Sequence, residues 1–181
     1  MRKQQREAIL ALLEETYMGT ETALNYSTPF ELLVAVIMSA QCTDERVNKI
    51  TARIFPKYNT PEKMGALSQE QLEEEIRDCG LFRSKAKNLL ATCKMLTEEY
   101  NSVIPDTVEE LMKLPGVGKK TANVVASIVY KVPAIAVDTH VFRVSHRLGL
   151  AKGDDPLAVE KELQKAIPKN KWSDAHHWLI W

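Results

Sequence analysis

The sequence predicts an all-α protein, in which helices joined by short connections form the whole fold. Signals that start and stop helices recur along the full 181 residues. The alternation of apolar and polar residues that marks a half-buried strand is nowhere sustained. Hydrophobic residues make up 45% and charged residues 27% of the chain, a globular mix with enough apolar material for a core. We therefore expect about ten helices.

Several residue pairs predict where individual helices begin and end. The pairs that fit an N-cap followed by proline, or a capping box, are Thr60-Pro61, Ser68 with Gln71, Asp106 with Glu109, and Asp155-Pro156. Gly80 stands where a helix C-cap belongs. Two buried helix faces are marked by apolar residues at helical spacing: Leu89, Cys93 and Leu96, then Val159, Leu163 and Ile167. Segment 132–137 is β-branched but contains a proline, so we expect an extended linker there.

The most specific motif is a glycine turn between two predicted helices, 106–113 and 121–130. Gly116 and Gly118 flank Val117 in this turn. Glycines allow backbone conformations closed to other residues and leave no side chain in the way of an approaching group. The turn brings its N–H groups to the N-terminus of the second helix, where anions bind. The motif therefore predicts a phosphate-binding hairpin, with a purely structural tight turn as the alternative.

Two lysines follow the turn, in the first turn of the second helix. The helix dipole disfavours a cation at this position by roughly 0.3–1 kcal/mol. Lys119 can offset that cost by binding a phosphate. For Lys120, the helix end and the neighbouring ammonium both disfavour the charged form, and an uncharged amine is what a nucleophilic lysine must supply. Two solvated lysines without a function are the alternative.

A single acid, Asp138, lies between Glu110 and Asp154. It precedes a predicted helix, so it fits an ordinary N-cap. A carboxylate among basic residues can also take a proton from Lys120 or stabilise positive charge that develops on a sugar.

Formal net charge is zero, yet the charges are unevenly distributed along the chain. The segment 111–147 holds the basic residues Lys113, Lys119, Lys120, Lys131, Arg143 and Arg147. A second stretch without acids holds Arg83, Lys85, Lys87 and Lys94. Such local basic faces favour a phosphate backbone as partner.

Neither a membrane segment nor a metal site is predicted. The longest apolar run, 32–38, is far shorter than the roughly 18 residues of a membrane span, and no cleavage-like site follows the N-terminal apolar stretch. We expect a cytoplasmic protein. The cysteines Cys42, Cys79 and Cys93 are widely spaced, which indicates buried or inert thiols and not a disulfide framework or a metal cluster.

These motifs resemble the endonuclease III branch of the helix-hairpin-helix DNA glycosylases. The matching stretches run in order from near residue 28 to the end of the sequence: 39–44 (SAQCTD), 80–86 (GLFRSKA), 114–123 (LPGVGKKTAN), 137–144 (VDTHVFRV) and 176–180 (HHWLI). The resemblance implies two all-α domains that flank a DNA-binding cleft. Residues 22–132 would form a six-helix domain that ends in the helix-hairpin-helix motif, about 107–130. Residues 1–21 and 133–181 would form the second domain.

The resemblance also implies a reaction. The substrate would be duplex DNA with an oxidised pyrimidine or an abasic site, and the damaged nucleotide would rotate out of the stack. Lys120 would attack C1′ and displace the base, and the resulting Schiff base would allow strand cleavage by β-elimination. Asp138 would assist as base and electrostatic partner. The protein would act as a monomer.

The remaining site residues are likewise carried over from the resemblance. Gln41 would fill the space left by the rotated nucleotide, and Leu81 would be an apolar wedge in the duplex. The other residues implied to contact DNA are Gly116, Val117, Gly118, Lys119, Thr121 and His140.

The family usually holds a [4Fe–4S] cluster with four cysteines in a loop beyond the helix that contains 176–180. Because the sequence ends at Trp181, we expect no cofactor to be held by these residues, and either a truncated chain or a form without the cluster. A truncated chain is expected to be less stable and to bind DNA more weakly.

Two other functions fit parts of the sequence. A monofunctional glycosylase, such as an adenine-mismatch enzyme, shares the hairpin and the aspartate but lacks the nucleophilic lysine. A non-catalytic helix-hairpin-helix module binds phosphates without chemistry. The presence of Lys120 disfavours the former, and Asp138 together with a hairpin embedded among many helices disfavours the latter.

Overall fold

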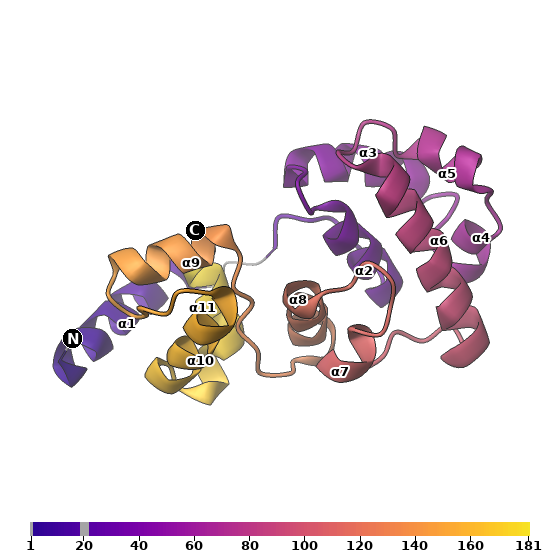
Figure 1. Ribbon diagram of the computed structural model, residues 1–181. Helices are drawn as coiled ribbons and strands as arrows, with labels where there is room; N and C mark the ends of the chain where they lie inside the picture. Colours follow the sequence, from indigo (N-terminus) through magenta and orange to yellow (C-terminus); the bar gives the residue numbers. More distant parts are fainter. Residues whose placement is uncertain (1, 19–21) are drawn as a thin grey trace. The chain divides into compact units, whose positions relative to one another are not determined.

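The computed structural model describes residues 2–18 and 22–181 (Figure 1). Within these residues it contains eleven α-helices and one short 3-10 helix, and no strand. The predicted all-α fold is confirmed. None of the described helices is both long enough and apolar enough to span a membrane.

The chain divides into two compact units. The central unit is Ala23–Val125, and the discontinuous unit combines Met1–Thr22 with Ala126–Trp181. Both ends of the chain therefore belong to the same unit.

The predicted domains have this same order, a central segment flanked by both ends of the chain, but their boundaries differ. The observed second boundary falls after Val125, inside a helix, whereas the predicted one falls after residue 132. Residues 19–21, which adjoin the predicted first boundary, lie outside the described residues.

The central unit is built from seven helices, the last of which continues into the other unit. They are α2 Pro29–Met38, α3 Asp44–Ile54, α4 Pro61–Gly65, α5 Gln69–Glu75, α6 Phe82–Glu99, α7 Val108–Leu111 and α8 Lys119–Tyr130. The longest apolar run, 32–38, lies within α2, and this helix is buried along almost its whole length. The helices α4 and α5 lie beside α6 (Figure 1). As predicted, Leu89, Cys93 and Leu96 lie on the buried face of α6.

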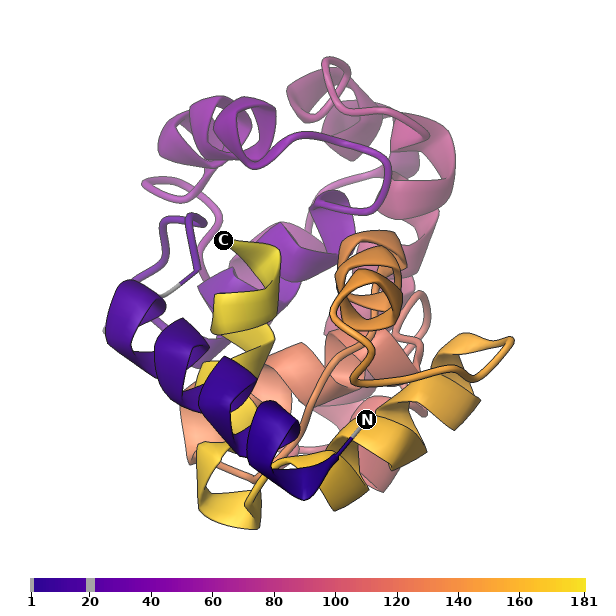
Figure 2. The ribbon, with the colours of Figure 1, turned by 90° about the vertical axis from the view of Figure 1, so that its left-hand side faces the viewer.

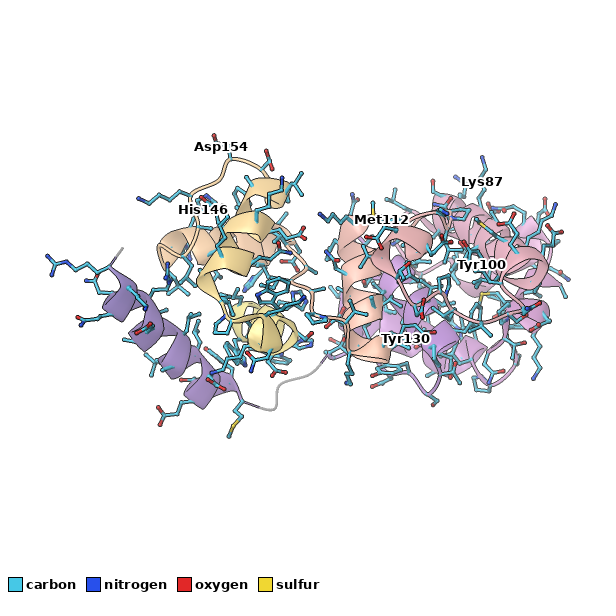
Figure 3. The ribbon with its side chains drawn as sticks, turned by 90° about the horizontal axis from the view of Figure 1, so that it is seen from below. Lys87, Tyr100, Met112, Tyr130, His146 and Asp154 are labelled. Carbon is cyan, nitrogen blue, oxygen red and sulfur yellow. The ribbon has the colours of Figure 1, made fainter. Side chains whose placement is uncertain are left out.

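The end of α6 is tied to α7 by one side-chain contact. Tyr100, labelled in Figure 3, donates a hydrogen bond from its hydroxyl to Glu110 Oε2 at 2.6 Å. Lys113 Nζ lies 2.8 Å from the other oxygen of the same carboxylate. The bond from Tyr100 therefore joins the short helix α7 to the end of the long helix α6.

The discontinuous unit combines both ends of the chain. Its helices are α1 Lys3–Tyr17, α9 Thr139–Arg147, α10 Pro156–Ala166, the 3-10 helix Lys169–Lys171, α11 Trp172–Ile180 and the end of α8. Figure 2 shows α1 beside α11, and Lys171 Nζ lies 2.6 Å from Glu14 Oε2 of α1. As predicted, Val159, Leu163 and Ile167 are buried in the core of this unit.

The segment predicted as an extended linker, 132–137, belongs to neither a helix nor a strand. It is buried at Ile135 and Val137. His176 Nδ1 lies 2.9 Å from the carbonyl oxygen of Ala136, so a buried imidazole from α11 provides a partner for this backbone.

Three of the four predicted helix starts are confirmed. Thr60, Ser68 and Asp155 each accept a hydrogen bond from the backbone N–H three residues later, and Ser68 with Gln71 forms a complete capping box.

The fourth predicted start and the predicted C-cap are wrong. The N-cap of α7 is Thr107, whose hydroxyl accepts from Glu110 N, so the start lies one residue after Asp106. Threonine and aspartate both serve as N-caps, and sequence alone does not choose between neighbours. Gly80 is not a C-cap, because α5 already ends at Glu75 and Ile76 is its cap.

Candidate active site

The predicted hairpin lies between α7 and α8 in the central unit. Val117 is 6% exposed, and its N–H bonds the carbonyl oxygen of Leu114 at 3.1 Å. Thr92 of α6 donates from its hydroxyl to the carbonyl oxygen of Pro115 at 2.9 Å. The turn is therefore fixed from both sides, by a buried valine and by a hydrogen bond to the long helix.

The two glycines of the turn have different structural roles. Gly116 has φ of +79°, and a Cβ built there would lie 2.9 Å from Asn88 Cβ. Only glycine fits this backbone and this close approach. Gly118 is outside the left-handed region, and a Cβ there would meet no atom within 4 Å. Of the two glycines, Gly116 adopts the backbone that only glycine favours, and Gly118 leaves open space where a side chain would stand.

Lys119 and Lys120 are the first two residues of α8, as predicted, and both are exposed. The first N–H groups of an α-helix have no partner within the helix. At this helix end they adjoin the open space beside Gly118 and the Lys119 side chain, an arrangement that suits a phosphate group.

Asp44, in the first turn of α3, lies within electrostatic reach of Lys120. Although the residue is exposed, desolvation around its carboxyl raises the pKa of Asp44, and the positive charge of Lys120 opposes this shift. Asp44 was not among the residues predicted for the site. Its place in the matching stretch 39–44 was the available signal.

Gln41 and Leu81 both have left-handed backbone conformations, with φ of 53° and 59°. Left-handed residues other than glycine are uncommon and cost roughly 1–2 kcal/mol each. Both side chains are exposed, and Leu81 is 56% exposed, which is high for a leucine. Such strained, exposed residues occur at sites with a function.

The turn before Leu81 closely approaches the backbone of Gln41. A Cβ built on Gly80 would lie 2.9 Å from the carbonyl oxygen of Gln41. Glycine is therefore required at position 80 by the neighbouring loop, and not by the end of a helix. The structure brings Gln41 and Leu81 onto adjacent turns of the central unit.

Asp138 and His140 lie in the discontinuous unit, at the start of α9. Asp138 is the N-cap of this helix and accepts from Val141 N at 2.7 Å. His140 is half-buried, and its Nδ1 lies 3.1 Å from Arg143 Nη2. The N-cap role foreseen for Asp138 is confirmed. The predicted roles of both residues in chemistry and DNA binding remain predictions.

The cysteines do not fit an iron–sulfur cluster. All three are free thiols, and no group of three or more metal-binding side chains occurs among residues 2–18 and 22–181. Cys79 Sγ donates to the carbonyl oxygen of Met38 at 3.3 Å, while Cys93 packs against Gly65. Burial raises the pKa of Cys79, and raises that of Cys93 to about 12. Neither thiol is suited to bind a metal as a thiolate.

Comparison with known proteins points to one family. Residues 34–169 match the family model described as HhH-GPD superfamily base excision DNA repair protein. The chain is 50% identical to endonuclease III of Bacillus subtilis (strain 168) over 177 residues, which is 97% of this chain and 81% of that protein. It is 47% identical to endonuclease III of Escherichia coli (strain K12) over 180 residues, which is 99% of this chain and 85% of that protein.

A solved structure resembles the whole described fold. It is a trapped endonuclease III–DNA covalent intermediate, an estranged-adenine complex, and it superposes with a TM-score of 0.96 at 52% sequence identity. The match covers 99% of this chain and 85% of that one.

Proposed function

The chain belongs to the endonuclease III family within the HhH-GPD superfamily of base excision DNA repair proteins, and we propose that Lys120 is the nucleophile of its reaction. It is a DNA glycosylase that also cleaves abasic sites. The observation that most supports Lys120 is its position, as an exposed amine in the first turn of α8 directly behind the hairpin. The similar endonuclease III forms a covalent intermediate with DNA, which requires a nucleophile of this kind.

The proposed reaction begins when the damaged nucleotide leaves the base stack, because C1′ of its sugar is out of reach inside a duplex. The uncharged amine of Lys120 attacks C1′, and the bond between C1′ and the base breaks. The base departs with the bonding electrons and takes up a proton. Loss of a proton from the nitrogen and opening of the sugar ring then give a Schiff base between Lys120 and C1′.

Strand cleavage follows from the Schiff base. The electron-poor C=N bond makes the C2′ proton acidic, and its removal expels the 3′ phosphate oxygen from C3′ by β-elimination. Water then hydrolyses the Schiff base and releases Lys120. We propose that Asp138 accepts a proton from the attacking amine and stabilises the positive charge that develops on the sugar.

The hairpin is proposed to bind the DNA backbone. Gly116, Gly118 and Thr121 would present backbone N–H groups or a hydroxyl to a phosphate, and Lys119 would add a positive charge. Val117, whose N–H bonds the carbonyl oxygen of Leu114, would hold the turn that contacts the DNA. His140 would contact a phosphate from α9. Gln41 and Leu81 would enter the duplex, since both are exposed on adjacent turns.

The proposed substrates are oxidised pyrimidines and abasic sites in double-stranded DNA, acted on by a monomer. The similar proteins named above come from bacteria, so we propose that this chain acts on chromosomal DNA in the cytoplasm. We propose that the residues of this sequence bind no iron–sulfur cluster themselves, since Cys79 and Cys93 are buried in unrelated contacts.

Borohydride trapping on abasic-site duplex DNA tests the nucleophile. We expect a covalent protein–DNA complex with the unmutated chain, none with Lys120→Ala, and trapping retained with Lys119→Ala at saturating DNA. Base release without trapping by the unmutated chain would identify a monofunctional glycosylase instead. DNA binding without base release would identify a non-catalytic module. Either result would reject Lys120 as the nucleophile.

A further inference from the structure

Lys85 is a buried lysine whose ammonium group contacts no carboxylate in the described part of the chain. It lies in the first turns of α6 and is 5% exposed. Burying an ammonium group is costly unless hydrogen bonds replace its water. Its Nζ donates to the carbonyl oxygen of Ala40 at 2.5 Å and to Cys79 Sγ at 3.2 Å. Both partners lie outside α6, so the charge is compensated by two neighbouring loops.

These two loops are the ones that present Gln41 and Leu81. Ala40 immediately precedes Gln41, and Cys79 lies two residues before Leu81. Cys79 Sγ in turn donates to the carbonyl oxygen of Met38, at the end of α2. The chain of contacts from Lys85 through Cys79 to α2 therefore joins the loop after α2 to the turn before α6.

Both loops are held in conformations that their sequences do not favour. Gln41 and Leu81 have positive φ values, and the Lys85 backbone N–H bonds the carbonyl oxygen of Leu81 at 3.0 Å. Strained residues of this kind persist only when their surroundings determine them. Two charge-assisted hydrogen bonds from one buried ammonium are stronger than neutral ones and restrict where the adjoining backbone can lie.

We propose that Lys85 is a positioning residue, which fixes the loops of Gln41 and Leu81 so that both side chains can enter the duplex together. This inference rests on the proposed function, in which these side chains replace and wedge apart bases. Lys85 acts through the two loops and touches no reacting atom. Its loss would therefore affect rotation of the damaged nucleotide out of a duplex, and not the attack of Lys120 on a sugar that is already accessible.

The test compares Lys85→Met with the unmutated chain on two DNA substrates. Methionine preserves the apolar stem without the ammonium, and replacement of a buried charge by an apolar residue is often tolerated by the fold. On a duplex that contains thymine glycol, we expect the single-turnover rate of base release to fall by about tenfold to a hundredfold, because small misplacements have effects of this size. On single-stranded abasic DNA, borohydride trapping should be unchanged. Lys63→Met, an exposed lysine of α4 in the same unit, is the matched control and should match the unmutated chain on both substrates.

A spectroscopic measurement reports the positioning step directly. With 2-aminopurine placed opposite the lesion, its fluorescence rises when the base loses its stacking. Lys85→Met should give a smaller rise at saturating protein than the unmutated chain. In a background of Gln41→Ala with Leu81→Ala, adding Lys85→Met should cause no further loss, because residues that act through one another are not additive.

The outcomes separate this inference from the proposed function. Failure of the unmutated chain to trap abasic DNA rejects Lys120 as nucleophile. The role of Lys85 alone is rejected in either of two cases, provided that the unmutated chain traps and excises normally. In the first, Lys85→Met releases the base from the duplex as fast as the unmutated chain does. In the second, Lys85→Met loses activity equally on the duplex and on single-stranded abasic DNA. If Lys85→Met does not fold, Cys79→Ala serves instead, because it removes one of the two hydrogen bonds of the Lys85 ammonium. Its rate of base release from the duplex must then fall, but by less than about tenfold to a hundredfold, with trapping on single-stranded abasic DNA unchanged. Any other result contradicts the inference.

Discussion

Lys120 occupies a position that helix stability alone does not favour. It is the second residue of α8, where the positive end of the helix dipole disfavours a cation by roughly 0.3–1 kcal/mol. The opposite charge of Asp44 compensates part of this cost. A residue that breaks a local rule for helix stability is typical of a functional site.

Replacement of Lys120 is therefore expected to abolish trapping without destabilising the protein. Alanine at this position removes the unfavourable charge and favours the helix. We expect the melting temperature of Lys120→Ala, followed by circular dichroism, to equal or exceed that of the unmutated chain by up to about 4 °C. A melting temperature several degrees lower would show that Lys120 supports the fold, and loss of trapping could then not be assigned to chemistry.

Leu81 presents a second conflict between stability and function. Its left-handed backbone is unfavourable for leucine, and its side chain is 56% exposed and gives little to the core. Leu81→Gly should change the free energy of unfolding by about 1 kcal/mol or less, in the stabilising direction if relief of strain exceeds the added freedom of the unfolded chain. Base release from duplex DNA should nevertheless fall, because the wedge is removed.

Lys131→Gly is the matched control for this substitution. Lys131 also has a left-handed backbone, with φ of 56°, at the C-terminal end of α8. The Lys131→Gly variant should show a similar small change in the free energy of unfolding, measured by urea denaturation. Its rate of base release should equal that of the unmutated chain. Equal rates of base release for both glycine variants would contradict the role of Leu81 as a wedge.

At the level of elements, the hairpin depends on one glycine more than on the other. Gly116→Ala places a Cβ 2.9 Å from Asn88 and requires alanine at φ of +79°. We expect it to lower the free energy of unfolding by about 1–3 kcal/mol. Gly118→Ala meets open space and should change it by no more than about 0.5 kcal/mol.

The same pair of variants distinguishes stability from binding. Gly118→Ala adds a methyl group on the side where a phosphate is proposed to approach, so its affinity for duplex DNA should fall although its stability does not. Urea denaturation and fluorescence anisotropy measure the two quantities. Equal destabilisation by both substitutions would mean that the backbone at Gly116 does not need glycine.

Features formed by residues close together in the sequence could be predicted, and features formed by residues far apart in the sequence could not. Local signals were sufficient for Ser68 with Gln71 and for Asp155, because a cap bonds a residue only three positions away. They failed for Gly80, whose small size is required by the carbonyl oxygen of Gln41, distant in sequence.

In the candidate site, too, contacts between neighbouring residues were predictable and contacts between distant segments were not. The turn between α7 and α8, with Gly116 and the two lysines that follow it, is a local motif whose place was predicted from sequence, while its binding of a phosphate stays a prediction. The proximity of Asp44 to Lys120, and the contacts of Lys85 with Ala40 and Cys79, arise from packing between distant segments. No periodicity or cap signal encodes such contacts.

The loop between α9 and α10, which contains Asp154 (Figure 3), is held by a carboxylate of α10. Glu162 Oε2 accepts from the N–H groups of Lys152 and Gly153 at 2.9 and 2.8 Å. These bonds lower the pKa of Glu162 below its ordinary value of 4.5. The stabilisation is therefore present above pH 4.5 and is lost as pH falls through the lower pKa of the folded state.

Glu162→Gln should consequently have a lower melting temperature than the unmutated chain at pH 7. This difference in melting temperature should become smaller toward pH 3. Thermal unfolding at both pH values measures it, with Glu15→Gln on the exposed face of α1 as the control for loss of one charge. A difference that is constant with pH would show that the Glu162 carboxylate contributes nothing through its charge.

At the scale of the whole molecule, zero net charge conceals an uneven distribution. Positive and negative side chains are equal in number, 24 each, so overall attraction cannot bring the chain to DNA. Binding must then depend on local basic groups such as Lys119. Each phosphate that a cation neutralises releases counterions, which makes affinity fall as salt rises.

We therefore expect the logarithm of the binding constant for duplex DNA to fall linearly with the logarithm of salt concentration, despite the neutral total charge. Lys119→Ala should reduce the steepness of that slope by about 1, the value for loss of one phosphate contact. Lys3→Ala, on exposed α1 where Lys3 pairs with Glu7, should leave the slope unchanged. Fluorescence anisotropy titrations across a salt series give these slopes. A flat response of the unmutated chain would argue against the phosphate backbone as its partner, and equal slopes for Lys119→Ala and the unmutated chain would remove Lys119 from the proposed hairpin site.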